Sequence, residues 1–161
     1  MSSKPGRGTT FSVYLPAITN VTSEAPPAVD ASFTGAGELV LIVDDEVAIR
    51  ETAGLVLTRL GCTPVLAGNA DEALALIARH GTAIRVVITD LHMPRIDGLA
   101  FVAAMRRTLP AVPVIVSSGR LDETAAPFRD LGVRLVLDKP FTKGQLAATL
   151  RLALDASGLA H

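Results

Sequence analysis

The sequence predicts an α/β fold in which five helices cover the faces of a five-stranded, doubly wound parallel sheet. Three observations lead to this prediction. Short apolar runs alternate with helical stretches after Glu38, the runs are rich in β-branched residues, and capping or turn residues separate the segments. Continuously apolar runs are typical of strands buried on both faces, and their alternation with helices is typical of βαβ units.

The predicted elements follow one another in strict alternation along the chain. Strands are expected at 39–43, 63–67, 85–89, 113–117 and 134–137. Helices are expected at 47–60, 70–80, 98–108, 122–131 and 143–156. Because Pro127 lies inside the fourth helix, this helix is expected to be short, bent, or to begin late near Ala126.

Two helix starts carry the spacing of a capping box. Asn69 is followed three residues later by Glu72, and Thr142 is followed in the same way by Gln145. Side chains at this spacing satisfy backbone N–H groups that have no partner inside the helix. Helices are therefore expected to begin directly after Asn69 and Thr142.

Composition limits the classes of function open to this chain. Of its 161 residues, 49% are apolar and 4% aromatic, so one domain with an aliphatic core and a short appendage is expected. Fifteen basic and 16 acidic residues give a net charge of -1, which argues against nucleic-acid binding. No stretch resembles a membrane span or a signal peptide, and the single Cys62 suits an inert buried thiol. We expect a cytoplasmic chain without membrane contact.

The first part of the chain has a different composition. From Thr19 to Gly37, Ser, Thr, Ala, Pro and Gly dominate without periodicity, so 19–37 is expected to be a linker. In the head, residues 1–18, apolar residues alternate through Phe11, Val13 and Leu15, which predicts one half-buried strand without an evident partner.

Carboxylates follow two of the predicted strands directly. Asp44 and Asp45 end the run 39–43, and Asp90 ends the run 85–89. Because ligands of open α/β sheets collect at the carboxyl ends of strands, these side chains are expected to share one pocket. Oxygen ligands of this kind suit Mg²⁺. The sequence therefore predicts an acidic magnesium site at one edge of the sheet.

Four ordered motifs resemble the receiver domain of two-component response regulators. They are Leu-Ile-Val-Asp-Asp-Glu at 41–46, Thr-Asp-Leu-His-Met-Pro-Arg-Ile-Asp-Gly at 89–98, Pro-Val-Ile-Val-Ser-Ser-Gly at 113–119 and Asp-Lys-Pro-Phe at 138–141. The resemblance implies a flavodoxin-like three-layer sandwich with strand order 2-1-3-4-5. It places the receiver at 38–158 and leaves 159–161 as a tail.

The resemblance also implies the roles of the acidic residues. Asp90 is expected to be the nucleophile that takes a phosphoryl group from phosphohistidine. Mg²⁺ is expected to bind Asp45, Asp90 and the main-chain carbonyl of His92, with Asp44 acting through water.

Further residues are implied to act on the phosphoryl group or on its lifetime. Lys139 supplies a positive charge to the phosphoryl oxygens, and Ser118 supplies a hydroxyl hydrogen bond. His92 and Arg120 occupy the positions that modulate hydrolysis in this family. Asp97 and Gly98 are interpreted as structural, at the start of the third helix.

One position departs from the family pattern. Receivers commonly carry an aromatic switch residue three positions before the lysine, where this chain has Val136. With Pro127 in the fourth helix, this departure suggests that the usual dimerisation face is altered or unused, and a dimer is left open. No output domain is expected after the last helix.

Residues 4–15 resemble the end of the ATP-binding domain of sensor histidine kinases. There a Gly-x-Gly-Thr turn, here Gly6 to Thr9, leads into the final strand. This implies that the chain is the C-terminal piece of a hybrid histidine kinase, whose parent can be membrane-anchored. The expected partners are a phosphohistidine domain, in the same parent chain, and a histidine phosphotransfer protein.

Two other functions remain as alternatives. A non-switching interaction module would keep the fold without productive phosphorylation, and Val136 motivates this reading. An aspartate-nucleophile phosphatase would need a second carboxylate two residues after Asp90, where this chain has His92.

Overall fold

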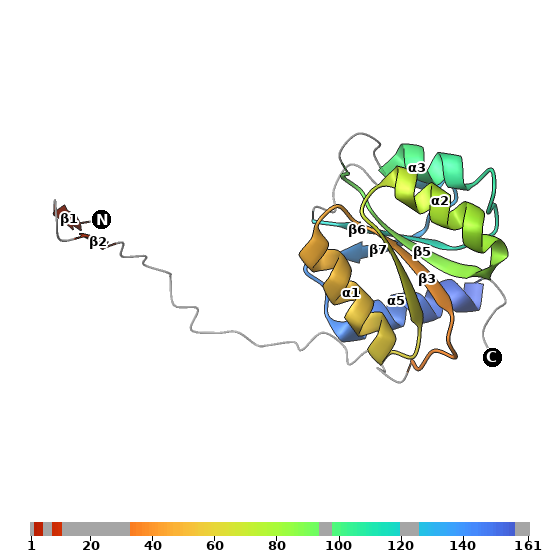
Figure 1. Ribbon diagram of the computed structural model, residues 1–161, viewed down its shortest axis with the longest axis horizontal. Helices are drawn as coiled ribbons and strands as arrows, with labels where there is room; N and C mark the ends of the chain where they lie inside the picture. The colour runs from red at the N-terminus through yellow and green to blue at the C-terminus, as the bar shows by residue number, and fades with distance from the viewer. Residues whose placement is uncertain (1, 5–7, 11–32, 94–97, 120–125, 157–161) are drawn as a thin grey trace.

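The computed structural model describes residues 2–4, 8–10, 33–93, 98–119 and 126–156 (Figure 1). Its main body is a parallel sheet of five strands in the order β4-β3-β5-β6-β7. The strands are β3 (Leu39–Val43), β4 (Thr63–Ala67), β5 (Ile84–Asp90), β6 (Val114–Ser118) and β7 (Leu135–Asp138). Numbered within the sheet, this order is 2-1-3-4-5, which confirms the predicted topology.

Helices cover both faces of the sheet and complete three layers (Figure 1). They are α1 (Val47–Arg59), α2 (Ala70–His80), α3 (Gly98–Met105), α4 (Ala126–Asp130) and α5 (Lys143–Ala156), with a short 3-10 helix, η1 (Gly81–Ala83), after α2. Helices α1 and α5 lie on one face, and α2, α3 and α4 contribute to the core on the other. None of the helices in the described ranges is long and apolar enough to cross a membrane.

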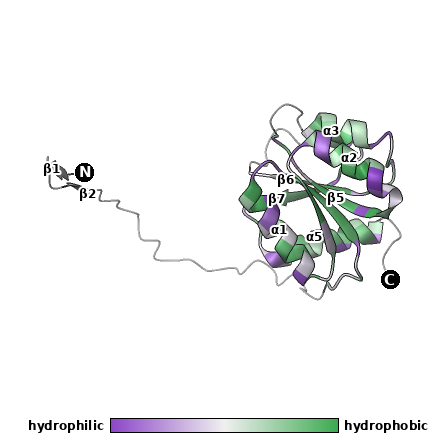
Figure 2. Cartoon of the chain, viewed as in Figure 1, coloured by the Kyte–Doolittle hydropathy of each residue, from purple (hydrophilic) through white to green (hydrophobic). Residues whose placement is uncertain are grey.

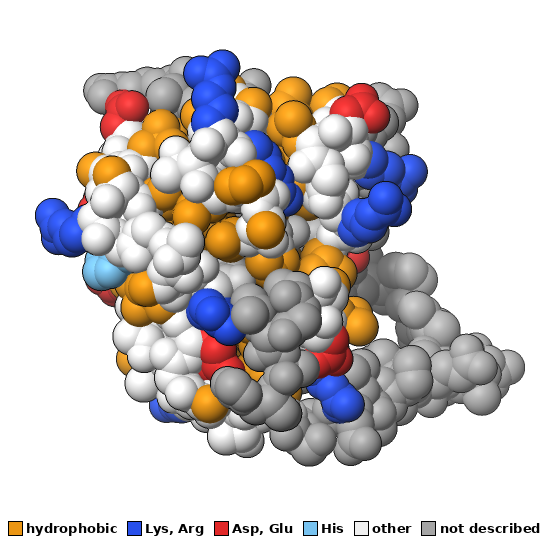
Figure 3. Space-filling model, turned by 90° about the vertical axis from the view of Figure 1, so that its right-hand side faces the viewer, with side chains coloured by type: hydrophobic (Ala, Val, Ile, Leu, Met, Phe, Trp, Pro, Cys, Tyr) orange, Lys and Arg blue, Asp and Glu red, His pale blue; other side chains and the backbone are white. Residues whose placement is uncertain are grey.

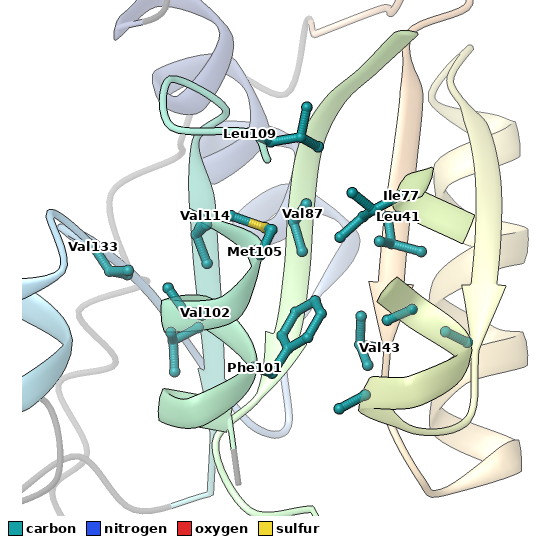
Figure 4. Close-up of a cluster of buried hydrophobic side chains, with 14 of the residues drawn as sticks. Leu41, Val43, Ile77, Val87, Phe101, Val102, Met105, Leu109, Val114 and Val133 are labelled. Atoms are coloured by element: carbon teal, nitrogen blue, oxygen red, sulfur yellow. The ribbon is translucent and has the colours of Figure 1, made fainter. Parts of the chain in front are cut away.

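Two apolar cores lie on opposite sides of the sheet because successive strand residues point to opposite faces. In β3, Leu41 and Val43 face the α2–α3 layer, whereas Val40 and Ile42 face the α1–α5 layer. Figure 2 shows the central strands as mostly hydrophobic, as expected for strands buried on both faces. Figure 4 shows the first core, where the Phe101 ring of α3 lies beside the strands.

The surface mixes charges of both signs. On the face seen in Figure 3, Lys and Arg side chains are interspersed with Asp and Glu among the residues drawn in colour. This arrangement agrees with the net charge of -1. No broad patch of one sign forms among the described residues of that face, so this face exerts no strong long-range attraction on charged partners.

The predicted elements agree closely with the observed ones, and the differences lie at their ends. The fourth helix begins at Ala126, next to Pro127, as one of the expectations for it stated. Helix α3 ends at Met105, three residues earlier than predicted. After this end, the Arg106 guanidinium binds the carbonyl oxygens of Pro110, Val112 and Leu131 and so holds the segment that follows the helix.

The capping boxes form as predicted at one helix and with a shift at the other. At α5, the N–H of Gln145 donates to Thr142 Oγ1 (3.2 Å), and the N–H of Thr142 donates to Gln145 Oε1 (2.8 Å). At α2, Asn69 Oδ1 accepts from the N–H of Glu72 (2.9 Å), but the Glu72 carboxylate accepts from Gly68 instead of Asn69. Both helices begin directly after the expected capping residue.

Residues 33–37, the described part of the expected linker, pack against the turn between α1 and β4. The N–H of Gly35 donates to the Leu60 carbonyl (2.6 Å), and that of Gly37 donates to the Gly61 carbonyl (2.9 Å). Gly61 has a φ of +80°, and a Cβ there would lie 2.5 Å from the Gly35 oxygen, so this close approach requires glycine. We call residues 33–37 the strap; its Phe33 packs against the α1–α5 core.

The head forms a short antiparallel hairpin of β1 (Ser2–Lys4) and β2 (Gly8–Thr10). Its pairing was not predicted because the polar residues of β1 lack the apolar alternation that indicates a strand. The strand expected from Phe11 to Leu15 lies outside the described residues, as do linker residues 19–32.

Candidate functional site

Four elements bring the predicted site residues to one edge of the sheet. Asp44 and Asp90 lie at the carboxyl ends of β3 and β5, and Ser118 ends β6. Lys139 follows β7. Parallel strands end at the same edge, so residues more than forty positions apart become neighbours. The site therefore follows directly from the topology.

Three carboxylates converge at this edge. Asp44, Asp45 and Asp90 each offer an oxygen within 4.8 Å of the others. Asp44 is 3% and Asp90 8% exposed, whereas Asp45 is exposed. Carboxylates crowded together in this way repel one another, and a hard divalent cation with oxygen preference relieves the repulsion. The donor set therefore fits Mg²⁺.

Lys139 bridges the two buried carboxylates. Its Nζ lies 2.7 Å from Asp44 Oδ2 and 2.8 Å from Asp90 Oδ2. Burial of the ammonium lowers the pKa of Lys139, but hydrogen bonds and attraction to Asp44 and Asp90 outweigh it and leave the pKa raised. Lys139 is therefore a permanent cation in contact with the predicted nucleophile.

Asp90 is held at both carboxylate oxygens. Oδ2 contacts Lys139, and Oδ1 accepts a hydrogen bond from the backbone N–H of His92 at 3.3 Å. Its main-chain carbonyl accepts from Thr89 Oγ1 at 3.1 Å. These contacts orient the side chain toward the cluster, where the predicted chemistry needs it.

Gly98, the first residue of α3, touches the backbone of Asp90. A Cβ on Gly98 would lie 2.4 Å from the Asp90 carbonyl oxygen and 3.1 Å from that of Leu91. The N–H of Gly98 donates to the Leu91 carbonyl at 3.2 Å. The structural role expected for Gly98 is thus a close approach that seats α3 against the loop after Asp90. Asp97 lies outside the described residues.

A backbone hydrogen bond joins Ser118 to Lys139. It is 4% exposed, and its carbonyl accepts a hydrogen bond from the N–H of Lys139 at 2.8 Å. The preceding carbonyl, of Ser117, accepts from the N–H of Leu91 at 3.1 Å. The end of β6 therefore connects the loops that carry Asp90 and Lys139.

The residues expected to modulate the site are less constrained. His92 is exposed, and the contact that joins it to Asp90 is made by its backbone. Val136 on β7 is 40% exposed. Arg120 lies outside the described residues.

A groove of about 600 Å³ adjoins the site. It runs between α1 and the segment that joins β7 to α5, with Ile49, Val56 and Phe141 among its apolar lining and Lys139 at one end. Val47 and Leu55 on α1 are also exposed, at 54% and 64%. An apolar surface therefore extends next to the buried carboxylates.

Arg50 belongs to the surroundings of the site but was not predicted. Its Nη1 donates to the main-chain carbonyl of Asp44 at 2.5 Å. The signal available in the sequence is one arginine six residues after an aspartate, and this spacing specifies no contact. The contact arises because α1 begins directly after the loop and directs Arg50 back toward the end of β3.

Comparison with known proteins gives a consistent result. Residues 40–151 match the sequence profile of the response regulator receiver domain. The sensor kinase CckA of Brucella abortus (strain 2308) is 30% identical over 162 residues, which cover 95% of this chain and 17% of that protein. The response regulator MprA of Mycobacterium sp. (strain KMS) is 36% identical over 117 residues, covering 71% of this chain and 50% of MprA. The chain thus spans half or less of these relatives.

Solved structures agree with the sequence comparison. The chemotaxis protein CheY4 of Vibrio cholerae superposes with a TM-score of 0.70 at 30% identity, covering 74% of this chain and 100% of CheY4. A response regulator receiver protein from Pseudomonas putida gives a TM-score of 0.66 at 36% identity, covering 74% and 99% of the two chains.

Proposed function

The chain belongs to the response regulator receiver domain family, and on this premise we propose that it is the phosphoacceptor of a two-component phosphorelay. Asp90 is the residue that receives the phosphoryl group. The observation that carries the proposal is the contact of Lys139 Nζ with both Asp44 and Asp90 inside a cluster of three carboxylates.

The chemistry is a transfer from nitrogen to oxygen. A carboxylate oxygen of Asp90 forms a bond to phosphorus, while the bond between phosphorus and the donor imidazole breaks and its electron pair stays on the imidazole nitrogen. Asp90 is suited to this role because His92 and Lys139 fix both carboxylate oxygens at the end of β5. Asp45 is exposed, and within the described part of the chain no hydrogen bond orients its carboxylate in this way.

Mg²⁺ would be held by Asp45, Asp90 and the main-chain carbonyl of His92, with Asp44 acting through water. When bound, it neutralises charge on the carboxylates and the phosphoryl oxygens. Lys139 supplies a second positive charge, already 2.8 Å from Asp90. The Ser118 hydroxyl hydrogen-bonds a phosphoryl oxygen.

The groove beside Lys139 supports a protein donor. A phosphohistidine domain must bring its imidazole to the edge where β5 ends, and an apolar surface next to that edge favours a bulky partner. We therefore propose a histidine kinase domain, or a histidine phosphotransfer protein, as the partner, and the cytoplasm as the compartment.

The alignment with CckA supports an origin in a hybrid histidine kinase. It covers 95% of this chain, and therefore extends beyond the receiver into the head. The alignments with MprA and with an NtrX-like response regulator of Rickettsia bellii are shorter, at 117 and 121 residues. We therefore propose that 1–18 are a kinase-domain remnant, 19–37 a linker, 38–158 the receiver and 159–161 a tail.

Labelling with acetyl phosphate tests the proposal. Wild-type protein with Mg²⁺ is expected to gain the mass of one phosphoryl group, and protein with excess chelator is expected to gain none. Asp90→Asn should abolish the gain, whereas Asp71→Asn, in the exposed first turn of α2, should retain it. Labelling that survives Asp90→Asn would contradict the assignment of the nucleophile.

A non-switching interaction module is the second candidate because Val136 replaces the aromatic switch residue. Absence of Mg²⁺ binding and of labelling in wild-type protein would favour it. A phosphatase has less support: the position two residues after Asp90 is an exposed histidine, and turnover of a simple phosphomonoester would be needed to establish it.

A further inference from the structure

Asp45 differs from its two neighbours in how its carboxylate is held. Asp44 and Asp90 both contact Lys139, but no hydrogen bond or ion pair within the described ranges holds the exposed carboxylate of Asp45. The position of this carboxylate therefore depends on the backbone of residues 44–46. Whatever fixes that backbone also fixes the most accessible oxygen of the cluster.

Arg50 holds this backbone from α1. Its Nη1 donates to the Asp44 carbonyl, which belongs to the peptide group that joins Asp44 to Asp45. On the other side of the turn, the N–H of Glu46 donates to Asp44 Oδ1 at 2.9 Å. The N–H of Arg50 donates to the Glu46 carbonyl at 3.0 Å. The first two hydrogen bonds thus fix the peptide planes on both sides of Asp45, and the third fixes the next plane, between Glu46 and Val47.

The guanidinium of Arg50 is itself confined by the loop after β4. A Cβ on Gly68 would lie 3.3 Å from Arg50 Nη1 and 3.5 Å from Glu72 Oε2. Glu72 Oε2 in turn accepts a hydrogen bond from the N–H of Gly68 at 2.7 Å. The guanidinium therefore packs on the bare backbone of Gly68, which Glu72 keeps in place. Arg50 connects the loops after β3 and β4.

We propose that Arg50 is a positioning residue that raises the Mg²⁺ affinity of the acidic cluster by holding the peptide between Asp44 and Asp45. This inference rests on the proposed magnesium-dependent function. Partners that orient a metal ligand typically contribute about 10-fold to 100-fold in affinity.

The direction in which Mg²⁺ affinity changes when Arg50 is replaced distinguishes a positioning role from the electrostatic effect of its charge. Arg50 carries a positive charge next to the cluster, so removing that charge alone makes the site more negative and strengthens Mg²⁺ binding. Loss of the hydrogen bond frees the Asp44–Asp45 peptide and weakens binding. The two effects act in opposite directions, and the proposal requires the second to dominate.

The test is a titration of ¹⁵N-labelled protein with Mg²⁺, followed by NMR. The variants are Arg50→Gln, Arg50→Lys and the control Arg59→Gln, an exposed arginine in the last turn of the same helix. Arg50→Gln is expected to weaken Mg²⁺ binding about tenfold. Arg50→Lys, which keeps the charge and one donor, should fall between this variant and wild type, and Arg59→Gln should match wild type.

Two further readouts distinguish positioning from general destabilisation. In metal-free protein, the Glu46 amide is expected to exchange with solvent faster in Arg50→Gln than in Arg59→Gln. At saturating Mg²⁺, the rate of labelling by acetyl phosphate should return to the wild-type value. If Arg50→Gln does not fold, comparison of Arg50→Lys with wild type carries the same test.

Equal or tighter Mg²⁺ binding by Arg50→Gln, with wild type binding normally, would overturn the role of Arg50 alone. Wild type that binds no Mg²⁺ would instead overturn the proposed function.

Discussion

At each end of the sheet a glycine permits a close contact between two backbone segments, but the surroundings of the two contacts differ. At the carboxyl end, Gly98 lets α3 lie against the backbone of Asp90, and the polar groups there are charged side chains held by Lys139. At the amino end, Gly61 lets the strap lie against the turn after α1, and the polar contacts are mainly backbone hydrogen bonds. The carboxyl end thus holds buried charged side chains, whereas the amino end holds the strap against the domain.

This difference predicts how substitutions at each end of the sheet affect phosphorylation. Buried charges gain little net stability, since desolvation opposes their attraction, so their presence at the carboxyl end is best explained by chemistry. The amino end carries the neutral thiol of Cys62, 5% exposed. Equivalent changes at the two ends should therefore have different consequences for phosphorylation.

The largest effect is expected for Lys139→Met. Removing the ammonium leaves Asp44 and Asp90 buried without their cation, which should lower the free energy of unfolding at pH 7 by about 3 kcal/mol in metal-free protein. Urea unfolding measures this change. Mg²⁺ should restore more stability to the variant than to wild type because it replaces the missing charge. An equal response of both proteins to Mg²⁺ would contradict the role of Lys139 as the cation of the cluster.

Gly98→Ala should come next. The added Cβ would lie 2.4 Å from the Asp90 carbonyl oxygen, so α3 or the Asp90 backbone must move. A loss of about 2 kcal/mol in unfolding free energy is expected, together with slower labelling by acetyl phosphate. The same substitution at Gly119 serves as the control, because among the described residues, its chain neighbours aside, no heavy atom lies within 4 Å of an added Cβ. Normal labelling by Gly98→Ala would show that the contact does not position Asp90.

Gly61→Ala makes the matching change at the amino end. A side chain at φ +80°, 2.5 Å from the Gly35 oxygen, should displace the strap and cost about 1 kcal/mol. Labelling at Asp90 should keep its wild-type rate. Hydrogen exchange at the Gly35 and Gly37 amides reports release of the strap directly. Slower labelling would mean that the two ends are coupled.

The smallest effect concerns the pH dependence of stability at the amino end. Burial, followed by charge and hydrogen bonding from Glu38, raises the pKa of Cys62 from 9.0 to about 11. The folded protein therefore retains this proton where the unfolded chain loses it, so stability falls as pH rises from 9 to 11. A fall of about 1–2 kcal/mol is expected relative to Cys62→Ala.

Lys139 contributes equally to the unfolding free energy of wild type and of Cys62→Ala. Subtracting one curve of unfolding free energy against pH from the other therefore removes its contribution. The raised pKa of Lys139 also gives stability that is complete below 10.5 and is lost as pH rises through its folded value. Parallel curves for wild type and Cys62→Ala between pH 9 and 11 would contradict the shift at Cys62.

Much of the fold could be predicted because each strand has a strong local signal. The run 39–43 is apolar throughout and ends in two carboxylates, and the observed strand has the same bounds. The convergence of Asp44, Asp45 and Asp90 followed from the rule that parallel strands end at one edge. The roles of Lys139 and Ser118 came from family resemblance, since a lysine or serine after a strand does not specify chemistry by itself.

The rest depends on packing between segments that are distant in sequence. The approach of Gly98 to Asp90 and that of Gly61 to Gly35 become visible only when the backbones are placed in space. Similarly, the contact of the Arg106 side chain with the Leu131 carbonyl, 25 residues away, could not be read from the sequence of α3. Local propensity cannot report such contacts.

Locating the phosphoryl group itself tests most directly whether Asp90 is the phosphoacceptor. After labelling with acetyl phosphate and Mg²⁺, borohydride reduction converts an aspartyl phosphate to homoserine, and peptide sequencing by mass spectrometry finds its position. We expect homoserine at position 90 and aspartate at positions 44 and 45. Homoserine at 44 or 45, or none in a protein that binds Mg²⁺, would contradict this expectation.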